Sequence, residues 1–215
     1  MIETKQGTGH ELIAPPQPYS ALIFDCDGTL ADTMPLHYQV WSTILSGQGL
    51  ELLEDQFYKL AGMPTVDIIR LLNDKHGCNL DVDSLHEEKE RLFLELAHKI
   101  QEVSAVADIA RSHFRKVPMA VASAGIRSVV EHTLKIVGLR KLFDVIISAE
   151  DVKRGKPAPD MFLLAAERMG VASEHCIVYE DADLGLEAAR RAGMRAVDVR
   201  VLWQGQPQRH VQGCC

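Results

Sequence analysis

The sequence has no long apolar run, no paired cysteine motif and no block of positive charge, and each absence excludes a class of protein. No stretch approaches the roughly 18 apolar residues of a membrane span. The five cysteines are odd in number and form no CxxC or cysteine–histidine pattern, which disfavours a zinc site. The net charge of −7 is spread along the chain, so we expect neither nucleic acid nor an anionic membrane as partner.

The ends of the chain and the cysteines favour the reducing cytoplasm. The first twenty residues lack a basic region followed by an apolar core, so we expect no secretory signal. Residues 1–19 contain three prolines and are expected to be irregular. Cys26, Cys78 and Cys176 are expected to be small buried hydrophobic residues, whereas Cys214 and Cys215 end a polar tail. We expect a monomer.

The hydrophobic pattern predicts an α/β fold with a doubly wound parallel sheet, Rossmann-like, and an inserted all-α domain. Apolar runs that predict strands occupy residues 21–25, 117–123, 143–148, 175–181 and 195–199. Helical patterns alternate with the last four of these strands, as in βαβ units. A helix is predicted from residue 33 to about 46, and residues 51–100 show only helical spacing. We therefore predict a core of residues 1–32 and 103–215, and a helical domain of residues 33–102.

The predicted strands end in residues that can carry chemistry. In open parallel sheets, ligands bind at the carboxyl ends of the strands, close to the point where the strand order reverses. In chain order the residues there are Asp25 and Asp27, Ser123, Lys156, and Glu180 with Asp181. Each alone could be a turn residue, a helix cap or a surface lysine. Together the carboxylates would repel one another unless a cation lay among them, and oxygen ligands favour Mg²⁺.

Four motifs resemble those of the haloacid dehalogenase superfamily: "DCDGTLADT", "VASAG", "GKPAPD" and "YEDADLGLEAARRAGM". The inserted helices resemble the small cap domain of its first subclass. Within that subclass, "KPAPDMFLLAAERMGV" is most similar to β-phosphoglucomutase-like hydrolases, especially the fructose-1-phosphate and 6-phosphogluconate phosphatase branch. The resemblance covers about residues 18–202 and implies a Mg²⁺-dependent phosphatase of small phosphorylated sugars.

The resemblance also implies roles for the residues at the strand ends. Asp25 would be the nucleophile that forms an aspartyl phosphate. Asp27 would act as general acid and base, with a pKa raised by the neighbouring acid. Asp25, the backbone carbonyl of Asp27, Glu180 and Asp181 would bind Mg²⁺. Ser123 and backbone N–H groups after it, from Ala124 on, would hold a phosphoryl oxygen at the start of a helix. Lys156 would pair with the nucleophile and the phosphoryl charge.

In the predicted cap, His37 and Lys89 match substrate-side residues of the mutase. His37 could instead be half-buried packing, and Lys89 could lie on a solvated helix face. Thr65 stands where the mutase has an arginine for a second phosphate, which favours hydrolysis, although Arg70 one turn later could compensate. The alternatives are therefore a β-phosphoglucomutase, a signalling phospho-acceptor domain and a dehalogenase. The phospho-acceptor domain lacks a second aspartate and a helical insertion, and the metal ligands argue against a dehalogenase.

Overall fold

A five-stranded parallel sheet forms the centre of the fold in the computed structural model, which describes residues 9–203. The strands are β1 (Ala21–Phe24), β2 (Met119–Ala122), β3 (Val145–Ile147), β4 (Cys176–Glu180) and β5 (Arg195–Asp198). They lie in the order β3-β2-β1-β4-β5, and every neighbouring pair is parallel. The strand order reverses between β1 and β4, which makes this the place where a ligand is expected.

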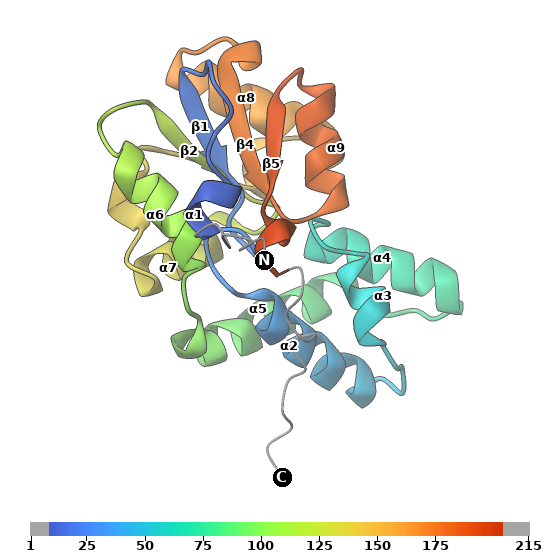
Figure 1. Cartoon of the computed structure of the whole chain (residues 1–215). Coiled ribbons are helices and arrows are strands. Elements are labelled where there is room, and N and C mark those ends of the chain that lie inside the picture. Colours follow the sequence, from blue (N-terminus) through green and yellow to red (C-terminus); the bar gives the residue numbers. More distant parts are fainter. Residues whose placement is uncertain (1–8, 204–215) are drawn as a thin grey trace, which may run out of the picture.

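Helices cover both faces of the sheet, as Figure 1 shows. On one face lie α6 (Ser104–His113) and α7 (Arg127–Ile136), with the short α1 (Gly9–Leu12) packed on α6. On the other face lie α8 (Asp160–Met169) and α9 (Asp183–Arg191). Alternate residues of β1 serve the two layers, since Leu22 and Phe24 pack in one hydrophobic cluster and Ile23 in the other. The predicted doubly wound α/β fold is confirmed.

The first four helices after β1 form a separate part of Figure 1, below the sheet. They are α2 (Met34–Gly47), α3 (Glu54–Tyr58), α4 (Thr65–His76) and α5 (Val82–Leu96). Their apolar side chains, among them Trp41, Ile69 and Phe93, form one hydrophobic cluster, which Val129 of α7 also joins. We keep residues 33–102 as a proposed cap domain and residues 1–32 with 103–215 as the proposed core.

The local structure departs from the sequence expectations in four places. Residues 9–12 form a helix inside the segment expected to be irregular, and α6 was not predicted at all. Helix α7 begins at Arg127, so Ser123 to Gly125 form a bend before the helix rather than its start. Cys78 follows the end of α4 and is only partly buried, and its thiol donates to the Asn73 side chain.

The remaining described segments are short 3₁₀ turns and connecting loops. The turns are Ala97–Lys99, Arg140–Leu142, Ala149–Asp151, Ser173–His175 and Val199–Trp203. None of the helices within residues 9–203 is long and apolar enough to cross a membrane. Cys214 and Cys215 lie outside the described residues.

Candidate active site

The carboxyl ends of β1 and β4 bring three acids together. Asp25 follows β1 directly, Glu180 is the last residue of β4, and Asp181 comes next. One carboxylate oxygen of each lies within 4.8 Å of the others. Because β1 and β4 are hydrogen-bonded neighbours in register, Phe24 lies opposite Tyr179 and the residues that follow must share one edge. The convergence of these acids therefore follows from the strand order.

Lys156 joins two of the acids from the loop before α8. Its Nζ donates hydrogen bonds to Oδ1 of Asp25 at 2.6 Å and to Oε1 of Glu180 at 2.5 Å. The ammonium side chain is fully buried. Burial opposes its charge, but the charges of Asp25 and Glu180 outweigh burial and raise the pKa of Lys156. The lysine therefore stays positively charged and fixes the position of both carboxylates.

Two glycines let the backbone come close to these acids. A Cβ at Gly185, in α9, would lie 1.7 Å from Oε1 of Glu180. A Cβ at Gly28 would lie 2.1 Å from Oδ2 of Asp181, and Gly28 also has a φ of +83°. Glu180 further accepts a hydrogen bond from the backbone N–H of Ala182 at 2.7 Å. The acids thus lie in fitted positions against the turn after β1 and the first turn of α9.

The crowding of buried carboxylates perturbs their ionisation. Burial raises the pKa of Asp25 to about 8, the charges of Glu180 and Asp27 add to the rise, and Lys156 opposes it. Burial, with the charges of Glu180 and Asp25, raises the pKa of Asp181 well above its usual value. A single ammonium does not balance this group of acids. Hard oxygen donors gathered in this way fit a divalent cation such as Mg²⁺.

Asp27 has a different environment from Asp25. Its Oδ1 accepts a hydrogen bond from the Thr33 hydroxyl at 2.8 Å and lies 3.3 Å from Nε2 of His37, and its Oδ2 accepts from the Ser123 hydroxyl at 3.3 Å. Burial raises the pKa of Asp27, but the hydrogen bonds from His37 and Thr33 and the charge of Lys89 bring it to about 2. The expectation of a raised pKa is wrong for this structure, because hydrogen-bond donors surround the carboxylate.

Ser123 and the bend after it are hydrogen-bonded to each other and to the end of β3 and the segment after it. The Ser123 hydroxyl accepts a hydrogen bond from the N–H of Gly125 at 3.1 Å. The carbonyl of Gly125 in turn accepts from the N–H of Ala149 at 3.1 Å. Ala124 lies between them and lines the same cavity as Asp25. The N–H of Gly125 is thus already used within the bend.

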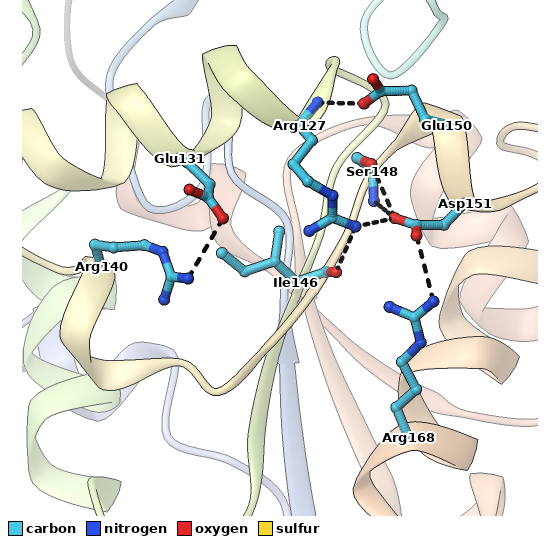
Figure 2. Close-up of polar contacts among 8 residues, drawn as sticks. All are labelled: Arg127, Glu131, Arg140, Ile146, Ser148, Glu150, Asp151 and Arg168. Carbon is cyan, nitrogen blue, oxygen red and sulfur yellow. Dashed lines mark hydrogen bonds and ion pairs between the residues drawn. The ribbon is translucent and has the colours of Figure 1, made fainter.

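A network of charged side chains holds the other side of this bend (Figure 2). Asp151 accepts hydrogen bonds from the N–H and hydroxyl of Ser148 at 2.8 Å each, and it also pairs with the guanidinium groups of Arg127 and Arg168. The backbone N–H of Arg127, at the first residue of α7, donates to Glu150 at 2.5 Å. The segment after β3 therefore anchors the start of α7, and with it the bend that follows Ser123.

A cavity lies between this edge of the sheet and the helical insertion. The core lines it with Asp25, Asp27, Ser123, Ala124, Gly125, Glu180, Asp181 and Ala182. The insertion lines it with Met34, His37, Trp41, Phe57, Leu60, Ala61, Gly62, Met63, Thr65, Ile68 and Lys89. One wall is therefore acidic and hydrogen-bonding, and the other is mostly apolar with two basic residues. Such a cavity suits a small ligand with one charged end.

Both predicted cap residues, His37 and Lys89, line the cavity. The His37 ring stacks on Phe93 with the ring centroids 4.2 Å apart, so it both packs and faces Asp27. Lys89 does not lie on a solvated helix face, since only 5% of it is exposed. Its Nζ donates to Oε1 of Glu90 at 2.9 Å. Arg70 does not line the cavity; it is exposed and pairs with Asp67.

Three residues at the site were missed from the sequence. The Thr29 hydroxyl, in the turn after β1, donates to Oδ1 of Asp181 at 3.2 Å. Thr33 bonds Asp27, and Glu90 pairs with Lys89. Thr33 was detectable in principle, because it lies six residues after Asp27 within the same motif. The contact of Thr29 spans 152 positions, so only the strand order reveals it.

Comparison with known proteins agrees with this geometry. The profile of the family described as "Haloacid dehalogenase-like hydrolase" matches residues 22–199. Fructose-1-phosphate phosphatase YqaB of Escherichia coli (strain K12) is 41% identical over 86% of this chain and 98% of its own length. A "phosphorylated carbohydrates phosphatase" of Thermotoga maritima is 32% identical over 82% of this chain and 83% of its own.

A solved structure shares the arrangement of core and inserted helices. CbbY from Rhodobacter sphaeroides, solved in complex with phosphate, superimposes with a TM-score of 0.75 at 27% identity. The superposition covers 83% of this chain and 85% of that protein. The likeness therefore extends over most of both chains.

Proposed function

We propose that this chain, which belongs to the haloacid dehalogenase-like hydrolase family and is a phosphoric monoester hydrolase, releases phosphate from small sugar phosphates such as fructose 1-phosphate or 6-phosphogluconate. The observation that carries the proposal is the group formed by the buried Asp25, Lys156 and Glu180 with the partly buried Asp181. Removing these charged groups from water is unfavourable and does not stabilise the fold. A site for phosphoryl transfer, in contrast, requires such a group of charges.

In this proposal Asp25 is the nucleophile. Its Oδ1 is held by Lys156, and the carboxylate lines the cavity. Attack of Asp25 on phosphorus forms the bond from its oxygen to the phosphoryl group as the bond to the sugar oxygen breaks. Water then cleaves the aspartyl phosphate and regenerates the carboxylate. The buried ammonium of Lys156 lies beside the phosphoryl charge throughout.

Asp27 transfers the protons. With a pKa of about 2 it is ionised in the free enzyme, ready to take a proton. A phosphate dianion beside it raises that pKa by like-charge repulsion, which allows Asp27 to gain a proton and donate it to the leaving sugar oxygen. The same carboxylate then deprotonates the attacking water. His37 and Thr33 orient the carboxylate through their hydrogen bonds.

The acids at the edge of the sheet fit Mg²⁺, which we propose as the cofactor. Asp25, the backbone carbonyl of Asp27, Glu180 and Asp181 would hold it. When bound, the ion offsets the repulsion between the phosphoryl group and the carboxylates. Ser123 and the bend after it, with Ala124, would bind a phosphoryl oxygen. Thr29 orients Asp181 for its role as ligand through a hydrogen bond.

Hydrolysis is favoured over mutase chemistry by the cap wall. A mutase must hold a second phosphate, yet Thr65 stands at the expected cationic position and donates its hydroxyl to Glu90 at 3.1 Å. Arg70 is directed to solvent, with 64% of its side chain exposed, and cannot compensate. We also propose a monomer in a reducing cytoplasm, in keeping with the free thiols of the described cysteines.

A screen of phosphorylated sugars and sugar acids tests the proposal through released inorganic phosphate, with Mg²⁺ and with chelator. We expect turnover of several sugar phosphates that is lost on chelation and restored by Mg²⁺. Single phosphorylation of the protein without turnover would instead identify a phospho-acceptor domain. Conversion of β-glucose 1-phosphate to glucose 6-phosphate at a rate rivalling phosphate release would contradict the preference for hydrolysis.

A further inference from the structure

The cap wall of the cavity holds little unpaired charge. Among the described residues of the helical insertion that line the cavity, only His37 and Lys89 can carry charge. His37 faces the core acids, with its Nε2 3.3 Å from Oδ1 of Asp27, and so belongs to the phosphate side of the cavity. The cation that could meet the end of a substrate opposite its phosphate is therefore the ammonium of Lys89.

This ammonium already has a buried partner. Oε1 of Glu90 accepts hydrogen bonds from Lys89 at 2.9 Å and from Thr65 at 3.1 Å. Nε2 of His86 lies 3.8 Å from the same oxygen. Lys89 is 5% exposed and Glu90 8%, so solvent screens their charges weakly. The pair adds no net charge to the cap wall.

We propose that Glu90 sets the substrate class by cancelling the charge of Lys89, so that the cavity accepts a neutral, hydroxyl-bearing end and rejects an anionic one. This inference rests on the proposed function. A sugar hydroxyl can accept a hydrogen bond from Lys89 while the lysine keeps its carboxylate partner. A carboxylate or second phosphate at the same place would be repelled by the negative charge of Glu90, which lies just behind Lys89. It would also lose its hydration on entering the cavity.

Glu90 acts through Lys89 and is a positioning residue, since it does not itself line the cavity. Of the two kinds of substrate named above, neutral sugar phosphates are therefore preferred over phosphorylated sugar acids. The discrimination appears in KM more than in kcat, because the far end of the substrate is remote from the reacting phosphorus. A purely structural role for Glu90 would change turnover of both kinds of substrate alike.

Glucitol 6-phosphate and 6-phosphogluconate form a matched pair of probes, because they differ only in a CH₂OH group against a carboxylate at the far end. We expect wild-type kcat/KM to favour glucitol 6-phosphate by about tenfold or more, which corresponds to about 1.4 kcal/mol. Glu90→Gln keeps an oxygen for Lys89 and Thr65 but removes the charge. It should shift the ratio about tenfold toward the acid, mainly through KM.

Glu88→Gln is the control, since it removes the same charge from an exposed position of the same helix and should leave the ratio unchanged. A wild-type enzyme without preference for glucitol 6-phosphate would overturn the inference, and this result needs no variant to fold. The inference would also be overturned if a folded Glu90→Gln variant kept the wild-type ratio of kcat/KM for the two probes. An equal shift of that ratio in Glu88→Gln would overturn it as well. Absence of phosphate release from every sugar phosphate would instead overturn the proposed function.

Discussion

Substitution of Gly185 by alanine should disable the site through Glu180 alone. The new Cβ would lie 1.7 Å from Oε1 and 2.0 Å from Cδ of Glu180. Ordinary contacts are about 3.4 Å or more, so the carboxylate must move by well over an ångström. Such a movement breaks its hydrogen bonds to Lys156 at 2.5 Å and to the N–H of Ala182 at 2.7 Å.

The expected loss is large because a displacement of about 1 Å in an active site can cost about 10²-fold in rate. We expect kcat/KM for a sugar phosphate to fall at least about 100-fold. Stability should also fall by about 1–3 kcal/mol from overpacking, although alanine is ordinarily the better residue within a helix. Phosphate release and thermal unfolding measure the two effects.

Gly47→Ala is the matched control. Gly47 ends α2, and an added Cβ there would meet nothing within 4 Å. The Gly47→Ala variant should have the same kcat/KM as the wild type. A Gly185→Ala variant that keeps wild-type kcat/KM would show that the fitted position of Glu180 is irrelevant to catalysis and would refute the reasoning.

Two further substitutions test residues that orient the site. Thr29→Val removes the hydroxyl that donates to Asp181 and should raise the Mg²⁺ concentration for half-activation by about tenfold. Thr133→Val is the control, because it removes a buried hydroxyl that has no hydrogen-bond partner among the described residues. It should leave the Mg²⁺ concentration for half-activation unchanged. Asp151→Asn weakens the network of Figure 2, so KM should rise several-fold and stability fall by about 1–2 kcal/mol, whereas Glu131→Gln should alter neither. An unchanged activation curve or KM would contradict the respective role.

Much of the fold was predictable because its signals are local. The inner strands of a sheet covered on both faces are continuous apolar runs, and the edge strand β5 follows a helix in the same alternation, so all five were found. Helix α6 was missed because its buried face, Val106, Ala107, Ile109 and Ala110, is half alanine and resembles a weakly polar linker. Ala124 and Gly125 were expected at the start of a helix, whereas they form a bend before α7 in which the Ser123 hydroxyl accepts a hydrogen bond.

The site was predictable in its members but not in their contacts. Residues at strand ends follow from the order of elements, which is why Asp25 and Glu180 could be named. The pKa of Asp27 could not be predicted, because it depends on which donors surround the carboxylate. The environment of Lys89 could not be predicted either. Its neighbours in the sequence are charged, yet Lys89 and Glu90 form a buried ion pair in α5. Only the packing of α5 against α2 and α4 determines that orientation.

The rate of phosphate release by Asp25→Asn, measured with saturating Mg²⁺ and a sugar phosphate that the wild type hydrolyses, tests the central claim most directly. The amide has the shape of the carboxylate, and Lys156 keeps Glu180 as a partner, so the variant should fold normally. Because an amide cannot accept the phosphoryl group in its place, we predict a fall of several orders of magnitude. A folded variant that retains most of the wild-type turnover would contradict the account.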